Sequence, residues 1–205
     1  MKHVFKKGTN ATAPTLLMLH GTGGNEHDLL SIASMIDEEA NVLSVRGNVL
    51  ENGMPRFFKR LAMGVLDQED LALRTKELHD YIKEASEEYG FDRENVVAVG
   101  YSNGANIAAN LVMTEKNSLA GAILYHPMIP NQDAKIPELT GLPVFIGAGV
   151  NDQMVPYTES EGLKAMLLEH GAEVDMHVEP YGHQLTGSEV EASKIWYNRN
   201  FKQTN

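Results

Sequence analysis

Short apolar runs alternate with amphipathic stretches along almost the whole chain, and this alternation limits the possible folds more than any other feature. Apolar runs of strand length occur at residues 15–19, 41–45, 95–99, 120–125 and 143–148, and residues 172–179 alternate between apolar and polar as a final strand would. Stretches with helical spacing lie between and after them, at residues 29–36, 71–89, 103–114, 157–170 and 186–201. Continuous apolar strands that alternate with helices predict an α/β fold, a mostly parallel sheet with helices on both faces. Residues 3–6 are expected to add an antiparallel edge strand.

The length of the chain fits a single domain. Its 205 residues are enough for one substantial core, and no repeat or linker-like tract interrupts them. We therefore expect one domain over residues 1–205, without a large cap domain. The segment 46–66 breaks the alternation with glycines and a proline, and we expect an irregular loop there that borders the substrate pocket.

Composition excludes several functions. The chain has no cysteine, which rules out disulfides, thiolate metal sites and a cysteine nucleophile. Its net charge of −11 repels phosphate backbones, so no nucleic-acid partner is expected. The apolar runs are too short to span a bilayer, and the first residues lack the apolar region of a signal peptide. We expect a cytoplasmic protein with no membrane partner.

The sequence Gly100-Tyr101-Ser102-Asn103-Gly104 follows the apolar run 95–99 and opens a helical stretch. A G-x-S-x-G motif between a strand and a helix is typical of a nucleophile elbow, in which the serine sits on a sharp, strained turn. The glycines are needed because bulk on either side of the serine would clash with the neighbouring strand or helix. Ser102 is therefore the candidate nucleophile.

A serine hydroxyl needs a base, and in this kind of fold the partners follow in the order serine, acid, histidine. The histidines after Ser102 are His126, His170, His177 and His183. His183 lies just past the last predicted strand, in a loop that can fold back toward Ser102, and is the candidate base. His126 follows an earlier strand, but no acid at a strand end separates it from Ser102.

Asp152 is the candidate acid, because it is the only carboxylate directly after the predicted strand 143–148. Its role would be to hold the imidazole in the required tautomer and to stabilise the imidazolium. A competing acid, Asp133, lies in a polar loop. Asp152 could instead be a turn or capping aspartate.

The glycine-rich segment His20-Gly21-Thr22-Gly23-Gly24 follows the first apolar run. Glycines let a chain present backbone N–H groups to a small anion. We expect an oxyanion hole made by the N–H groups of Thr22 and Asn103. A phosphate-binding loop is the alternative, but the segment lacks the lysine and hydroxyl residue of a P-loop.

The segment 46–66 offers candidates for substrate binding. Phe57 and Phe58 are expected to wall an acyl or aryl pocket, although packing of the loop is an equal alternative. Arg56 belongs to a basic cluster with Lys59 and Arg60, for which we favour a solvated face over binding of an acidic substrate group. His126, after the strand 120–125, is also expected to line the pocket.

These motifs together resemble the phospholipase/carboxylesterase family of small α/β hydrolases. The matching stretches are residues 19–24, 100–105, 149–156 and 182–183, and residues 45–58 resemble a bacterial carboxylesterase subgroup that includes hydrolases linked to quinone resistance. The resemblance implies ester hydrolysis through an acyl-enzyme, no cofactor and no metal, and often a homodimer. One departure is Asn103, where many family members have glutamine, which weakens the case for acyl-protein thioesterase activity.

The sequence therefore predicts a serine carboxylesterase acting on small esters, with short-chain or aryl groups. An acyl thioesterase or lysophospholipase is the alternative within the same chemistry, and peptidase activity is a weaker one. A non-catalytic ligand-binding protein remains the alternative from another class, because a fold alone does not fix a function.

Overall fold

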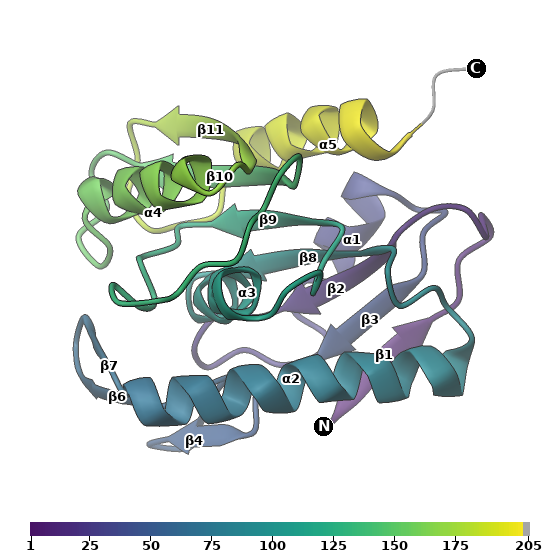
Figure 1. The fold of residues 1–205 in the computed structure, drawn as a ribbon, viewed down its shortest axis with the longest axis horizontal. Coiled ribbons are helices and arrows are strands. Elements are labelled where there is room, and N and C mark those ends of the chain that lie inside the picture. The colour runs from purple at the N-terminus through teal and green to yellow at the C-terminus, as the bar shows by residue number, and fades with distance from the viewer. Residues whose placement is uncertain (203–205) are drawn as a thin grey trace.

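Seven strands form the central sheet in the order β1-β3-β2-β8-β9-β10-β11 (Figure 1). The computed structural model describes residues 1–202, so residues 203–205 of the expected domain lie outside the described part. β1 runs antiparallel to β3, and all other neighbours are parallel, which confirms the predicted sheet. The strands are β1 (His3–Lys6), β2 (Thr15–Leu19), β3 (Val42–Val45), β8 (Val96–Tyr101), β9 (Gly121–Tyr125), β10 (Pro143–Gly149) and β11 (Glu173–Glu179).

Five helices cover the two faces of this sheet (Figure 1). They are α1 (Leu30–Ile36), α2 (Gln68–Tyr89), α3 (Asn103–Thr114), α4 (Tyr157–Glu169) and α5 (Gly187–Phe201). Side chains of α2, α3 and α4 pack with Leu17 and Leu19 on one face, and those of α1 and α5 pack with Leu16 and Met18 on the other. Successive residues of a strand point to opposite faces, so each buried strand serves both cores.

The segment 46–66 is more regular than its sequence suggested. It forms two antiparallel hairpins, one of β4 (Val49–Glu51) with β5 (Met54–Arg56), the other of β6 (Arg60–Ala62) with β7 (Val65–Leu66). Asn52 and Gly53 connect the first hairpin with positive φ angles of 52° and 79°. An Asn-Gly pair between strands is a strong hairpin signal, and it corrects the expectation of an irregular loop.

The carboxyl ends of the parallel strands lie along one edge of the sheet, and the loops that follow them carry the candidate site residues. No helix in the described part of the chain is both long and apolar enough to cross a membrane.

Candidate active site

Ser102 occupies a strained turn between β8 and α3. Its backbone has φ 52° and ψ −112°, a region that residues with a side chain rarely adopt. The Ser102 N–H donates to the carbonyl of Tyr125 at 2.9 Å, which holds the turn against β9. A Cβ on Gly104 would lie 1.9 Å from the Leu19 carbonyl oxygen, and one on Gly100 would lie 2.5 Å from that of Gly104. Only glycine fits at either position, as the motif predicted.

Three loops bring Ser102, His183 and Asp152 into one hydrogen-bonded row. The Oγ of Ser102 lies 2.8 Å from Nε2 of His183. The Nδ1 of the same imidazole lies 2.6 Å from Oδ2 of Asp152. An imidazole that donates from Nδ1 to a carboxylate keeps a lone pair on Nε2, which can take the serine proton. The residues predicted to act together are thus in contact.

The Asp152 carboxylate is held on both oxygens. Its Oδ1 accepts from the backbone N–H groups of Met154 and Val155, each at 2.8 Å, while Oδ2 faces the histidine. Burial alone would raise the pKa of this carboxyl, but the hydrogen bonds from Val155, His183 and Met154 outweigh it and lower the pKa. Asp152 therefore stays ionised and fixed in orientation.

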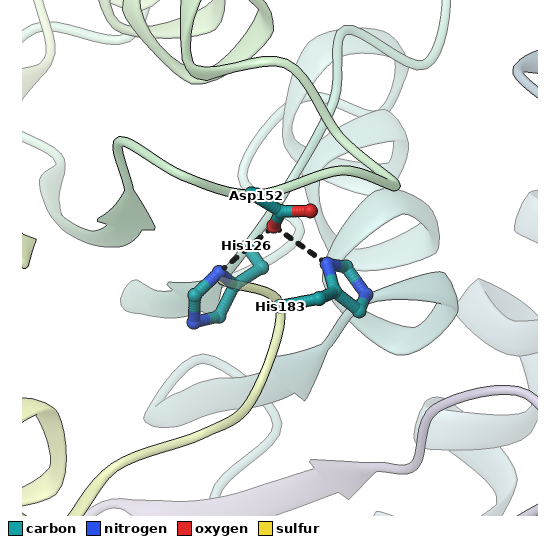
Figure 2. A group of neighbouring side chains, drawn as sticks. All are labelled: His126, Asp152 and His183. Carbon is teal, nitrogen blue, oxygen red and sulfur yellow. Dashed lines mark hydrogen bonds and ion pairs between the residues drawn. The ribbon is translucent and has the colours of Figure 1, made fainter. Parts of the chain in front are cut away.

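His126 does not line the pocket, which corrects one sequence prediction. Its side chain is 2% exposed and lies between two carboxylates: Nδ1 is 3.2 Å from Oδ2 of Asp152, and Nε2 is 3.0 Å from Oε1 of Glu189. Figure 2 shows the imidazoles of His126 and His183 turned toward the same aspartate. Sequence patterns did not point to Glu189 as a partner of His126, because Glu189 lies on α5, far away along the chain.

A histidine that donates from both ring nitrogens must carry a proton on each. Burial opposes the charge on His126, but the hydrogen bond and charge of Glu189, together with Asp152, outweigh it and raise the pKa. The arrangement therefore favours the protonated form of His126 behind Asp152.

The same three residues have the spacing of a metal site, since their ligand atoms all lie within 4.8 Å of one another (Figure 2). The 2.6 Å contact between His183 Nδ1 and Asp152 Oδ2 argues against an ion there. Two ligands held at ~2.0–2.2 Å from a tetrahedral ion lie further apart than this contact. In addition, a nitrogen that donates its proton to Asp152 has no lone pair for a metal. We assign hydrogen bonds to this cluster.

The backbone N–H groups of Thr22 and Asn103 meet no hydrogen-bond acceptor within the described residues. Both residues line the cavity beside Ser102. The Asn103 amide belongs to the first turn of α3, where N–H groups are free and the helix dipole favours negative charge. The pair thus has the properties that an oxyanion hole requires.

The side chain of Asn103 has a separate role, which the sequence did not reveal. Its Oδ1 accepts from the Phe57 N–H at 2.7 Å. His20 adds a second tie, because its Nε2 accepts from the Gly47 N–H at 3.0 Å. These two hydrogen bonds hold the segment 46–66 against the residues that follow β8 and β2. Tyr101 also fixes the site, since its hydroxyl donates to the carbonyl of His183 at 2.7 Å.

A cavity of about 370 Å³ opens beside Ser102 and His183. Phe57 and Phe58 are not among the side chains that line it. They are 1% and 0% exposed and belong to the core packed by α2 and α3, which corrects their expected role as pocket walls. Four methionines supply apolar walls instead, namely Met54, Met63, Met128 and Met154. Flexible methionines suit a pocket of irregular shape.

Arg56 does reach the cavity, but it is not part of a solvated face. The residue is 4% exposed, and its Nη1 donates to Oγ1 of Thr22 at 2.8 Å. Arg60, on the next hairpin, also lines the cavity. The expectation of a solvated face is wrong for Arg56, because the packing of the hairpin, which the sequence alone does not show, buries this residue.

Comparison with known proteins assigns this chain to a family. Residues 2–198 match the family described as phospholipase/carboxylesterase. The chain belongs to the phospholipase/carboxylesterase family.

Two bacterial proteins resemble this chain over nearly their full length. MhqD of Bacillus subtilis, named as a hydrolase, is 55% identical over 197 residues, which cover 96% of this chain and 98% of MhqD. The crystal structure of the Bacillus cereus carboxylesterase is 58% identical, with a TM-score of 0.97 over 98% of this chain and 95% of that chain. Acyl-protein thioesterase 1 of Cryptococcus neoformans is more distant, at 27% identity over 176 residues, or 77% of this chain and 74% of that protein.

These comparisons confirm the expected α/β-hydrolase fold and a carboxylesterase-like hydrolase. They also rank the alternatives within the phospholipase/carboxylesterase family, because the carboxylesterase is a much nearer relative than the thioesterase.

Proposed function

We propose that the protein is a serine carboxylesterase that hydrolyses small carboxylic esters through an acyl-enzyme on Ser102. The observation that carries this proposal is the continuous hydrogen-bonded row from Ser102 through His183 to Asp152, beside an open cavity. A serine hydroxyl is a weak nucleophile by itself, and this row supplies the base that activates it.

Acylation begins when Oγ of Ser102 attacks the ester carbonyl carbon and passes its proton to Nε2 of His183. The carbonyl oxygen becomes an oxyanion, which accepts hydrogen bonds from the N–H groups of Thr22 and Asn103. Asp152 stabilises the imidazolium. When the intermediate collapses, the bond to the alcohol breaks, and His183 returns the proton to the departing oxygen.

Deacylation repeats these steps with water. His183 takes a proton from water as the water oxygen attacks the acyl carbon, and the same amides hold the second oxyanion. The bond to Oγ then breaks, Ser102 recovers its proton from His183, and the carboxylic acid leaves.

The cavity supports small substrates. Its volume of about 370 Å³ is near the lower end of the ~300–1,000 Å³ range of small-ligand sites. A thioester is one alternative substrate, supported by the distant thioesterase relative. A lysophospholipid is the other. Peptidase activity and a purely ligand-binding role are the weaker alternatives.

Turnover of 4-nitrophenyl acetate and 4-nitrophenyl butyrate by the wild type and by Ser102→Ala tests the proposal. We expect the variant to lose at least about 10³-fold in kcat, because removal of a triad member leaves only binding and the oxyanion hole. Ser34→Ala is the matched control, since Ser34 is exposed on α1. Wild-type turnover in Ser102→Ala would exclude Ser102 as nucleophile, and no turnover by the wild type would favour the ligand-binding role. Acyl thioesters in the same panel separate the two hydrolase alternatives.

We also infer a homodimer and a cytoplasmic location from the family resemblance. Light scattering of the purified protein and fractionation of cells test these two points.

A further inference from the structure

The cavity beside Ser102 is lined by two arginines and, among the described residues, by no carboxylate. This contrasts with a chain that has 28 acidic and 17 basic residues. Arg56 comes from β5 and Arg60 from β6, so both hairpins of the segment 46–66 contribute a cation. The substrate would therefore enter a positively charged pocket in an acidic protein.

The guanidinium of Arg56 is fixed in place. Its Nε donates to the Phe58 carbonyl at 3.1 Å, and its Nη1 donates to Oγ1 of Thr22 at 2.8 Å. Within the described part of the chain, Nη2 makes no hydrogen bond, and it is not sealed from solvent. One face of a rigid fork is thus free to bind a further acceptor.

The two arginines are only half neutralised. Both contact Glu51, with Arg56 Nη1 at 3.4 Å from Oε2 and Arg60 Nε at 2.9 Å from Oε1. The hydrogen bond from Arg60 lowers the pKa of Glu51, so it remains a single negative charge between two cations. Burial and the charge of Arg60 both lower the pKa of Arg56. A second anion beside the guanidinium would raise the pKa of Arg56 again.

The free charge lies close to the reacting atoms. Thr22 accepts a hydrogen bond from Arg56 through its hydroxyl, and its backbone N–H is one of the two proposed oxyanion donors. Met54 and Met63 line the same cavity as the two arginines and Ser102, and Nη1 of Arg60 lies 3.6 Å from Sδ of Met63. A ligand that fits this cavity of about 370 Å³ is short, and the arginines favour one with an anionic end.

We propose that the preferred substrates are short esters that themselves carry a carboxylate, which the pair Arg56 and Arg60 binds while the ester carbonyl faces Ser102. This inference rests on the proposed esterase function and names its substrate class. Arginine suits the task because its planar fork matches a carboxylate.

A matched pair of esters tests the inference: the half-ester 4-nitrophenyl hydrogen glutarate and its uncharged methyl ester, methyl 4-nitrophenyl glutarate. We expect the wild type to prefer the half-ester in kcat/KM by at least about tenfold, the effect of one charge-assisted hydrogen bond. Arg60→Gln is expected to remove most of this preference. Lys59→Gln is the matched control, because Lys59 is exposed, adjacent in sequence and outside the cavity lining, and it should keep the wild-type ratio.

A measurement on the wild type alone guards against misfolding of the variant. Glutarate should inhibit hydrolysis of the uncharged ester at least about tenfold more strongly than glutaramide does. Equal inhibition, an unchanged ratio in Arg60→Gln, or a wild-type preference for the uncharged ester would each overturn the carboxylate site. If the uncharged ester is still cleaved in a Ser102-dependent way, only this inference fails. If the wild type cleaves neither ester, the esterase proposal fails as well.

Discussion

Replacing Asp152 by asparagine exchanges one oxygen for an NH₂ group, and the neighbouring hydrogen bonds allow the new amide only one orientation. In the wild type, Oδ1 accepts from the N–H groups of Met154 and Val155, while Oδ2 accepts from His183. The asparagine amide has one oxygen, and only the oxygen can accept those two backbone bonds. The NH₂ group must therefore take the place of Oδ2 and point a donor at His183.

This donor reverses the histidine tautomer. Nδ1 of His183 must then be the acceptor, and its proton moves to Nε2, which lies 2.8 Å from Oγ of Ser102. A protonated Nε2 cannot accept the serine proton. We expect kcat at pH 7.5 to fall by about 10⁴-fold, the loss that a wrong tautomer causes in a comparable triad. The carboxylate also faces His126, so the variant loses an ion-pair partner there as well.

Initial rates with 4-nitrophenyl acetate measure the loss, and thermal unfolding shows whether the variant is folded. Asp133→Asn is the matched control, because Asp133 is an exposed carboxylate in a polar loop and should keep wild-type activity. A folded Asp152→Asn variant with kcat within about tenfold of the wild type would refute the tautomer argument.

Three further predictions concern stability. Gly104→Ala would place a Cβ 1.9 Å from the Leu19 carbonyl oxygen. We therefore expect the free energy of unfolding, measured with urea, to fall by at least about 3 kcal/mol, and a fall below about 1 kcal/mol would contradict this. Burial alone would raise the pKa of Glu26, but hydrogen bonds from its own backbone and from Arg46 outweigh this and lower the pKa from 4.5 to about 2. At ~1.4 kcal/mol for each unit of pKa difference, the ionised Glu26 carboxylate contributes about 3 kcal/mol to the free energy of unfolding at neutral pH, and the wild type loses this as the pH falls from 4.5 toward 2. Glu26→Gln should lack this part of the acid dependence. Parallel curves of unfolding free energy against pH for the two proteins would count against it. The pKa of His126 is raised above 6.5, so its ion pairs stabilise the fold fully below pH 6.5 and less as the pH rises through the raised pKa. Glu189→Gln keeps the capping of α5 but should flatten this alkaline decline, and an unchanged decline would assign it to another group.

Sequence alone was enough for the fold class and for the order of the candidate residues. Apolar runs of strand length identified the five inner strands β2, β3, β8, β9 and β10, because burial on both faces leaves a signal in each strand by itself. The edge strand β11 is only partly buried, and its alternation of apolar and polar residues predicted it. Ser102, Asp152 and His183 each follow a predicted strand, and parallel strands end at one edge. Their mutual proximity therefore followed from local patterns.

Residues whose environment depends on distant packing were not accessible in this way. Phe57 and Phe58 have the same apolar character whether they wall a pocket or fill a core, and only the position of α2 and α3 decided that they fill the core. His126 meets Glu189 because α5 packs beside β10, a relation between segments 63 residues apart that leaves no periodic signal.

The segment 46–66 shows the same division. Its sequence already contains the Asn52-Gly53 turn and the basic cluster, so the hairpin and the charge are local properties. Whether Arg56 is solvated or buried against the cavity depends on its hydrogen bond to Thr22 and on the bond between Asn103 and Phe57. The sequence thus determined the α/β-hydrolase frame and the placement of Ser102, Asp152 and His183 at strand ends. Tertiary structure decided the character of the pocket, because side-chain burial is set by partners from separate segments.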